Sequence, residues 1–430
     1  MDDETPHQQY NALRDRRVRA FILGRMLSGL GQQFITVAVG WELYERTHDP
    51  WALGLTGLFS AAPVFLLMIP AGNAADRYPR RNVAMLGYAL FALAALGLTV
   101  ISWMQAPVEL VYVMLLAIGS ARAFASPSVD SFLPQLVHRR QLANAQAWMA
   151  SVGQLSTIGG PPLGGFLIAA FGVATWTYLV AAGSGVLFVA LLTTMPSIAP
   201  PSTAAPRRAR DLFAGLGFIK RSQVFLAAMT LDLFAVLFGG AVALLPIYAK
   251  DVLDIGPTGL GTLRAAPAVG ALLMALYMAY RPPWERPGRV LLIAVTGFGI
   301  ATVGFGLSTN VYLSLAFLFL AGLTDSVSNV IRGTLEQMVT PDHLRGRVSA
   351  VEKVFVGFSN ELGGFRSGAA AALWGPIFSV VSGGIGTLVV VAAVAAIWPA
   401  LARIGPLHTL RPPESDLLPR PERSAAPTSA

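Results

Sequence analysis

Long apolar stretches, separated by short polar segments, run along almost the whole chain. An α-helix needs about 20 mostly apolar residues to cross the hydrocarbon core of a bilayer. Twelve stretches reach that length, so the pattern predicts an all-α membrane protein with twelve transmembrane helices. The first stretch is expected to be retained, because it follows a polar head and is too long for a cleaved signal peptide. The helices are expected at residues 18–43, 52–75, 82–104, 108–133, 145–170, 174–195, 222–248, 258–280, 289–307, 311–336, 347–373 and 376–402.

Two polar segments interrupt this pattern. Residues 196–212 are rich in Pro, Ala, Ser and Arg, as flexible linkers are, and a Pro-rich tail follows residue 404. Residues 133–147 also resemble residues 335–349 at an offset of 202, which favours two homologous halves. The predicted organisation is a cytoplasmic head (1–17), a first six-helix half (18–195), a cytoplasmic linker (196–221), a second six-helix half (222–403) and a disordered cytoplasmic tail (404–430).

The composition is that of a membrane protein, so the positive net charge is interpreted as a sign of membrane topology. Hydrophobic residues make up 54% of the chain and charged residues 13%, whereas soluble domains carry about 25% charged residues. The net charge of +8 would suggest nucleic-acid binding on a soluble protein. Here the basic residues fall in alternate loops, and the opposite loops carry only Arg46 and Lys250. This positive-inside pattern predicts two cytoplasmic termini in a bacterial inner membrane, a lipid bilayer as the surroundings and no nucleic-acid partner.

No enzyme site stands out in the sequence. The chain has no cysteine, and its five histidines lie in predicted loops or tails without the spacing of a metal pair. It also lacks the Gly-x-x-x-x-Gly-Lys-Ser/Thr loop that cradles phosphates. We therefore expect no catalysis, no cofactor and no metal site, and an ion gradient as the energy source for any transport.

The segment between the second and third predicted helices reads GNAADRYPRRN (72–82). A glycine lets a helix approach its neighbour closely, a helix-end aspartate can meet arginines or a helix N-terminus, and arginines offer rigid hydrogen-bonding forks. The alternative is a solvated, positively charged loop without a further role. The residues concerned are Gly72, Asp76, Arg77, Arg80 and Arg81.

This segment resembles the signature Gly-x-x-x-Asp-Arg-x-x-Arg-Arg of the major facilitator transporters. The resemblance implies the major facilitator fold, in which two pseudo-symmetric six-helix halves rock around a central site. It also implies that the segment is an inner gate, with Asp130 at the inner end of the fourth helix as the acid that pairs with its arginines. The second-half counterpart (280–289) lacks the aspartate, so the gate is expected to be asymmetric.

The fifth predicted helix carries GGPPLGG (159–165). Glycines thin a helix for close packing and proline bends it, so packing alone would explain the segment. Gly160, Pro161, Gly164 and Gly165 also resemble, in part, a signature of exporters in this superfamily.

Four further segments resemble one bacterial subfamily of transmembrane secretion effectors, typified by the enterobactin exporter. Compared with that subfamily, this chain has Gln32, Gly364 and Arg366 where acids are common. These departures remove negative charge from the expected cavity and weaken the case for a cationic substrate. The segments are residues 231–253, 256–273, 340–351 and 359–368.

Charged side chains inside the predicted spans are the candidate contacts of substrate and protons, because each costs roughly 2.5–3.5 kcal/mol near the bilayer centre. Asp232 and Asp325 are candidate proton carriers, and a permanent pair with Arg264 or Arg366 is the alternative. The remaining cations would suit an anionic or polar substrate. The predicted pathway consists of Arg25, Gln32, Gln33, Arg122, Asp232, Arg264, Asp325, Asn329, Glu361 and Arg366, and Glu352 and Lys353 also fall within spans.

Together these observations predict a secondary active transporter that exports a small organic molecule, such as a siderophore, a drug-like compound or a metabolite, in exchange for protons. The small-molecule substrate and protons are its expected partners, and a monomer is its expected functional unit. Two alternatives stay open. One is a proton symporter that imports a metabolite, and the other is a membrane receptor or assembly protein that uses the same fold without transport.

Overall fold

The computed structural model describes residues 12–198 and 216–406. Most of the predicted head and linker and nearly all of the predicted tail lie outside these ranges, whereas residues 12–17 of the head are described and already contain the start of the first long helix. Residues 216–221 are helical, so the C-terminal end of the predicted linker belongs to a helix. Within the described ranges the chain is helical and contains no β-strand.

The first half consists of six long helices, one for each predicted span. Their ends differ from the predicted ones by at most a few residues, and α6 is shorter than its predicted span. α1, α2 and α5 extend the prediction at both ends, and Asp15 and Asp49 cap the first two. The helices are α1 (Arg16–Thr47), α2 (Pro50–Arg77), α3 (Arg80–Trp103), α4 (Glu109–Leu136), α5 (Leu142–Phe171) and α6 (Thr175–Thr193).

The second half repeats this arrangement with one interrupted span. The predicted span 222–248 is α8 (Gln223–Phe238) followed by η4 (Ala241–Leu244), α9 (Leu245–Ile247) and the π-helical η5 (Tyr248–Val252). The α-helix stops at two glycines, Gly239 and Gly240, and Pro246 follows within the next turns, and these residues disfavour a continuous α-helix. The other helices are α10 (Gly256–Tyr280), α11 (Pro287–Leu307), α12 (Val311–Val339), α13 (Asp342–Trp374), α14 (Pro376–Ile397) and α15 (Pro399–Ala402).

Nine segments of the described chain are by themselves long and apolar enough to cross a membrane. The other three long helices, α1, α5 and α13, carry more polar residues and glycines. All three are interior helices, since α5 packs against α1 and α10, and α13 packs against α2 and α8. Their lower hydropathy therefore reflects contact with other helices rather than with lipid.

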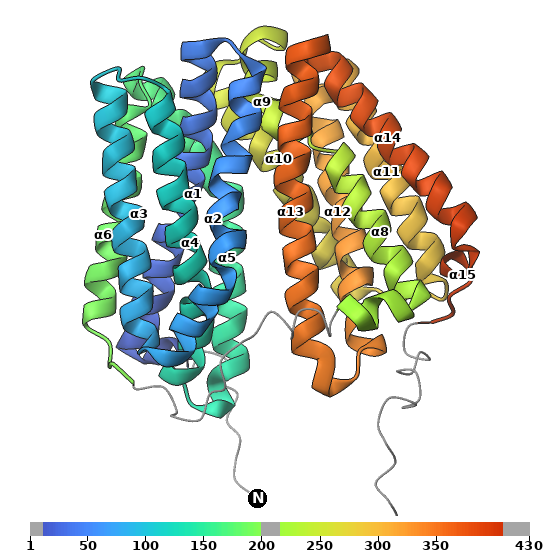
Figure 1. Cartoon of the computed structure of the whole chain (residues 1–430), viewed down its shortest axis with the longest axis horizontal. Coiled ribbons are helices and arrows are strands. Elements are labelled where there is room, and N and C mark those ends of the chain that lie inside the picture. Colours follow the sequence, from blue (N-terminus) through green and yellow to red (C-terminus); the bar gives the residue numbers. More distant parts are fainter. Residues whose placement is uncertain (1–11, 199–215, 407–430) are drawn as a thin grey trace, which may run out of the picture.

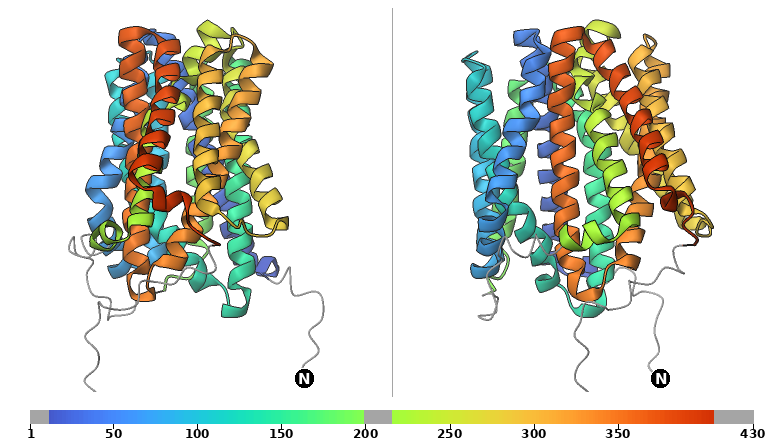
Figure 2. Two further views of the ribbon diagram at one scale, coloured as in Figure 1. Left: turned by 90° about the vertical axis from the view of Figure 1, so that its right-hand side faces the viewer. Right: turned by 45° about the vertical axis from the view of Figure 1, so that its right-hand side comes forward.

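The two halves stand side by side as separate bundles (Figures 1 and 2). They meet through two helix pairs, α2 with α13 and α5 with α10. α1 begins, and α14 and α15 end, at the same end of the molecule (Figure 1), which we call the terminal end. The opposite end, where α1 turns into α2, is the distal end. The predicted all-α fold of two six-helix halves is confirmed.

The buried apolar residues explain how the halves are joined. One cluster belongs to the first half alone and includes Phe21, Phe132 and Phe188. A second belongs to the second half alone and is built around residues such as Phe225 and Leu291. The third contains residues of both halves: Val37, Leu98 and Tyr178 from the first, and Leu244 and Leu260 from the second. The halves thus share a core toward the distal end and have separate cores toward the terminal end.

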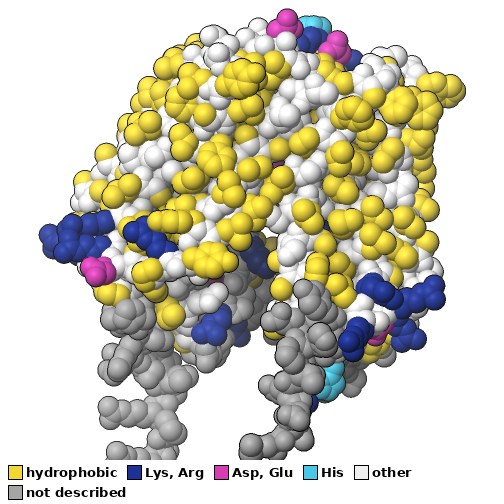
Figure 3. Space-filling view, turned by 180° about the vertical axis from the view of Figure 1, so that it is seen from behind, with side chains coloured by type: hydrophobic (Ala, Val, Ile, Leu, Met, Phe, Trp, Pro, Cys, Tyr) yellow, Lys and Arg dark blue, Asp and Glu magenta, His cyan; other side chains and the backbone are white. Residues whose placement is uncertain are grey.

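The molecular surface has the character of a protein in a bilayer. Large apolar side chains such as Leu66, Leu93 and Ile293 are exposed around the bundle, and Figure 3 shows hydrophobic side chains over most of one face. Lysine and arginine side chains gather toward the terminal end in the same view (Figure 3). Exposed apolar side chains in a broad band fit contact with lipid tails, and basic residues beyond the band fit an interface with water.

Candidate functional site

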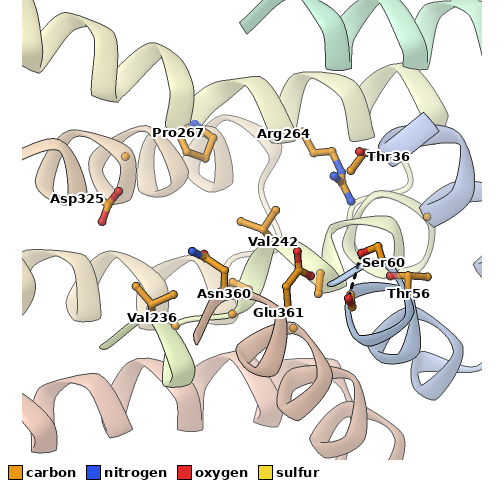
Figure 4. Close-up of a pocket in the computed structure, with 18 of the residues that line it drawn as sticks. Thr36, Thr56, Ser60, Val236, Val242, Arg264, Pro267, Asp325, Asn360 and Glu361 are labelled. Carbon is orange, nitrogen blue, oxygen red and sulfur yellow. Dashed lines mark hydrogen bonds between the residues drawn. The ribbon is translucent and has the colours of Figure 1, made fainter. Parts of the chain in front are cut away.

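A cavity of about 560 Å³ lies between the halves. It is walled by α1, α2, α3 and α4 of the first half, and by α8 and the interruption after it, α10, α11, α12 and α13 of the second. Figure 4 shows part of this cavity. Arg264, Thr36 and Glu361 lie toward one end of the view, and Asp325 lies toward the other. Its polar and charged lining residues are Gln32, Gln33, Thr36, Thr56, Ser60, Arg122, Asp232, Arg264, Thr302, Asp325, Asn329, Arg332, Asn360 and Glu361.

An ion-pair network occupies the second-half wall. Nη2 of Arg332 lies 2.8 Å from Oδ1 of Asp232, and its Nη1 lies 3.6 Å from Oε1 of Glu352. Nη2 of Arg332 also donates a hydrogen bond to Asn329, and Asn329 donates one to Asp325. Arg332 is 4% exposed and Asp232 is 5% exposed. This network links α8, α12 and α13 beside the cavity.

A second carboxyl group adjoins Glu352. Glu336 is 5% exposed, accepts a hydrogen bond from Ser349 Oγ at 2.6 Å, and lies close enough to Glu352 for the two carboxyl groups to act on each other. Two carboxylates so close repel each other unless one carries a proton. We call the four acids around Arg332 the acidic cluster; its members are Asp232, Asp325, Glu336 and Glu352.

Two members of this network escaped the sequence reasoning. Arg332 lies near the end of the predicted span 311–336, where an arginine also fits the positive-inside rule, and Glu336 is its last residue. The permanent pair considered for Asp232 was with Arg264 or Arg366, whereas its partner in the structure is Arg332. Helical spacing was the available signal, because positions 325, 329, 332 and 336 recur every three to four residues on one face.

Arg264 differs from Arg332 in its surroundings. It projects from α10 into the cavity on the side of α1 (Figure 4), and a Cβ atom on Gly40 would lie 3.5 Å from its Nη2. Its Nε is buried and makes no hydrogen bond. No ion pair or hydrogen bond of Arg264 occurs within residues 12–198 and 216–406.

Glu361 and Arg122 line the same cavity from opposite halves. The carboxylate of Glu361 packs against α2, where a Cβ atom on Gly57 would lie 2.6 Å from Oε2. The positive charge of Arg122 acts on Glu361 across the cavity, at more than direct ion-pair distance. Gln32 and Gln33 complete the first-half wall.

Two predicted pathway residues lie outside the cavity lining. Arg25 donates a hydrogen bond from Nη1 to the hydroxyl oxygen of Tyr88 at 3.3 Å, inside the first half. Arg366 donates from Nη2 to the carbonyl oxygen of Phe238 at 2.8 Å, and its guanidinium also lies over the Phe238 ring. The interruption after α8 leaves this carbonyl without its helical partner, so Arg366 serves the broken helix rather than the cavity.

The gate-like segment lies at the terminal end of α2 and α3. Gly72 is buried, Asp76 is half-buried and Arg77 is exposed. Arg80 donates to the carbonyl oxygen of Ser131 at 2.6 Å, and Arg81 donates to that of Met195 at 2.7 Å. These arginines therefore tie the segment to the ends of α4 and α6 within the first half.

Asp130 is the acid that the resemblance pairs with these arginines. It is exposed, and within the described part of the chain it forms no ion pair with Arg80 or Arg81. Arg80 binds the backbone carbonyl of the neighbouring Ser131 instead. The pairing of Asp130 with the arginines therefore stays a prediction for the state in which the gate is closed.

The glycine motif of α5 lies against two helices. Cβ atoms on Gly160 and Gly164 would meet α1, at 2.5 Å from Gln33 and 3.3 Å from Phe34. A Cβ atom on Gly165 would lie 2.2 Å from the carbonyl oxygen of Pro257 in α10. The backbone of the next turn, including Pro161, approaches α10 just as closely. Small residues thus allow α5 to sit between the halves.

The distal end is closed by contacts between the halves. Nζ of Lys250 lies 2.8 Å from Oε2 of Glu45, and the hydroxyl of Tyr44 donates a hydrogen bond to Asp251. The rings of Trp51 and Phe365 meet edge to face with centroids 5.3 Å apart. We call the Lys250–Glu45 and Tyr44–Asp251 contacts the distal latch.

The sequence of this chain is similar to those of known membrane transporters. The family model of the Major Facilitator Superfamily matches residues 21–351. The enterobactin exporter of Shigella dysenteriae is 28% identical over 376 residues, which cover 86% of this chain and 89% of that protein. The enterobactin exporter of an Escherichia coli O157:H7 strain is equally similar, with 28% identity over the same shares of the two chains.

Solved structures agree on the fold. The nucleoside transporter NupG has a TM-score of 0.71 at 13% identity, covering 92% of this chain and 100% of its own. A bacterial homologue of the human lysosomal transporter Spinster, in an inward-facing and unoccupied conformation, has a TM-score of 0.67 at 15% identity, covering 93% and 98%. At such low identity the likeness concerns the fold alone. With a family model that matches most of its length, this chain belongs to the Major Facilitator Superfamily.

Proposed function

We propose that this protein exports a small organic molecule across the bacterial inner membrane in exchange for protons, by alternating access. The observation that carries the proposal is the cavity between two bundles that share a core only toward the distal end. A polar and charged cavity inside an apolar shell is costly unless something polar occupies or crosses it. Such a cavity suits a small molecule far better than an interface with a protein partner.

The orientation follows from charge. Basic side chains gather toward the terminal end (Figure 3), and the positive-inside rule assigns such an end to the cytoplasm. Both termini would then be cytoplasmic. The distal latch would close the cavity on the outer side, so the arrangement in Figure 1 is ready to take up a molecule from the cytoplasm.

Export is favoured over import by two observations. The relatives with high coverage of this chain are named as enterobactin exporters, and the α5 glycine motif lies at the contact of α5 with α1 and α10. We propose that this contact moves as the halves, residues 18–195 and 222–403, rock within one monomer. Gly72, Asp76, Arg77, Arg80 and Arg81 would then form the cytoplasmic gate of the alternate state.

Proton coupling is assigned to the acidic cluster. Four acids surround one arginine, so full ionisation would leave an excess of three negative charges inside the second half. Uncompensated buried charges are costly, and carboxyl groups avoid that cost by binding protons. Asp232 and Asp325 line the cavity. Arg332 links them to Glu352 through its ion pairs with Asp232 and Glu352 and its hydrogen bond to Asn329, and Glu336 adjoins Glu352. A proton bound here can respond to the occupant of the cavity.

The test starts with a deletion strain compared with its parent for secreted metabolites and for sensitivity to a compound panel, with and without a protonophore. The compound that changes is then offered to inverted membrane vesicles. An exporter coupled to protons accumulates it when the vesicle lumen is acid and loses it when a protonophore is added.

Three outcomes would contradict the proposal, each in a different way. Accumulation driven by an alkaline lumen would indicate a symporter that imports. Accumulation that is insensitive to the pH gradient would exclude proton coupling. No vectorial movement of any compound, with an intact complex to another membrane protein, would indicate a receptor or assembly protein.

A further inference from the structure

The positive charges of the cavity are compensated unequally. Arg332 has direct carboxylate partners in Asp232 and Glu352. Arg122 has the charge of Glu361 facing it across the cavity. Arg264 has neither, because no carboxylate pairs with it in the part of the chain that the structure describes. One of the three arginines that line the cavity is therefore without an anion.

The setting of Arg264 aims it at the cavity. It leaves α10 of the second half and crosses toward α1, so its guanidinium lies beside the backbone at Gly40 and points toward Thr36 (Figure 4). The hydroxyl of Thr36, which lines the same cavity, donates to the carbonyl oxygen of Gln32. The Nε of Arg264 is enclosed without an acceptor. A guanidinium carries five N–H donors and no acceptor, so it needs oxygen atoms from another group.

The cavity that Arg264 enters also has apolar walls. Phe91, Leu115, Ile118 and Phe305 line the same cavity, and all four are at most 9% exposed. A bare inorganic anion would gain nothing from these side chains, whereas an organic body would bury apolar surface against them. The cavity thus combines one uncompensated cation with an apolar wall.

We propose that Arg264 binds a negatively charged oxygen group of the transported molecule, so that the substrate is a small organic anion with an apolar body. This inference rests on the proposed function and adds the class of substrate to it. The anion completes the hydrogen bonds of Arg264, and charge-assisted bonds between a guanidinium and an anionic oxygen group are among the strongest in proteins. Of the acidic cluster, Asp232 and Asp325 line the cavity from α8 and α12 rather than from α10, so the cluster stays free to exchange protons.

Binding to the purified full-length protein in detergent tests the inference. Three nearly isosteric probes differ in charge: naphthalene-2-sulfonate is an anion, naphthalene-2-sulfonamide is neutral and 2-naphthyltrimethylammonium is a cation. We expect the wild-type protein to bind the sulfonate more tightly than the sulfonamide, on the order of tenfold or more. The cation should bind most weakly.

Arg264→Gln should remove the preference for the sulfonate and leave the affinity for the sulfonamide nearly unchanged. Arg264→Lys keeps the charge and should keep part of the preference, which covers the case in which Arg264→Gln folds poorly. Arg25→Gln is the matched control, because Arg25 lies in the first half outside the cavity lining and is held by Tyr88. It should behave as the wild-type protein does.

Equal affinities for the three probes would overturn the inference, and so would a sulfonate preference that survives Arg264→Gln. The binding measurement uses no membrane and no gradient, so its result is separate from the vesicle experiment. A sulfonate preference that depends on Arg264, in a protein without vectorial transport, would overturn the proposed function and leave the anion site standing. If the protein transports only a neutral compound, the proposed function stands and the inference that Arg264 binds an anionic group is overturned.

Discussion

Arg264 and Arg332 lie in helices of the same half and line the same cavity, yet their surroundings are opposite. Arg332 is held by Asp232 at 2.8 Å and by Glu352 at 3.6 Å, and its neighbourhood contains more acid than base. Arg264 has no carboxylate partner within the described residues. The difference shows that the role of a buried charge depends on whether an opposite charge lies beside it. A compensated charge organises the protein, and an uncompensated one points to a ligand.

The comparison has an energetic side. Breaking a buried ion pair by removing one partner leaves the other charge stranded. Removing a buried charge that has no partner takes away an unfavourable term instead. The same substitution type is therefore expected to have opposite effects on stability at the two arginines. The predictions below test this contrast.

Arg332→Gln should have the largest effect. It strands Asp232 and Glu352, and loss of one partner of a buried pair costs about 3–5 kcal/mol. Thermal unfolding in detergent measures the loss. Adding Asp232→Asn to Arg332→Gln should recover part of the stability, because it removes one stranded charge. Arg403→Gln, at an exposed arginine of the terminal end, should change little, and an equal loss there would contradict the special role of Arg332.

Glu352→Gln should weaken the coupling to protons. The substitution removes one carboxyl group of the Glu336–Glu352 contact, so the cluster can no longer share a proton at this position. We expect gradient-driven accumulation in inverted vesicles to fall about tenfold, which corresponds to about 1.4 kcal/mol, while exchange at equal pH is retained. The neighbouring exposed Lys353 supplies the control Lys353→Gln. Unchanged accumulation in Glu352→Gln would exclude Glu352 as a proton carrier.

Arg264→Met should raise the stability of the ligand-free protein. Removing a charge without a partner is expected to add roughly 1–2 kcal/mol, the low end of the gain seen when buried charges give way to apolar side chains. The melting temperature in detergent is the measurement. Arg25→Met, which breaks the hydrogen bond to Tyr88, should not raise it. A lower melting temperature for Arg264→Met would mean that Arg264 is compensated in the folded protein.

Lys250→Gln should have the smallest effect. It removes the ion pair with Glu45 in the distal latch, and such partly exposed pairs contribute about 0.2–1 kcal/mol. The population open at the distal end should rise by at most about fivefold. The chain has no native cysteine, so a single Thr36→Cys reports this opening by its labelling rate from the distal side.

Arg46→Gln is the matched control for the latch. Arg46 binds Glu42 and the carbonyl oxygen of Ala106, both in its own half, so its loss should leave the labelling rate unchanged. If Arg46→Gln opens the distal end as much as Lys250→Gln does, the ion pair between the halves is not what holds that end closed.

Hydropathy predicted the twelve helices because the requirement for apolar length in a bilayer is local along the chain. It did not predict the interruption after Phe238, where consecutive glycines end α8 within an apolar run. For the site, Asp232, Asp325 and Arg264 could be found as charges within spans. Arg332 was missed because it lies near a predicted helix end, where an arginine also fits the positive-inside rule.

The sequence by itself determined that the chain is an all-α membrane protein, how many membrane-spanning segments it has and which charged residues lie within them. Apolar length and charge can be read one segment at a time. Only the tertiary structure decided which charges meet: that Arg332 joins α8 and α13, that Arg366 binds the broken helix, and that Arg264 faces the cavity alone. Compensation of a buried charge depends on distances of a few ångströms between helices, and these distances follow from packing rather than from position along the chain.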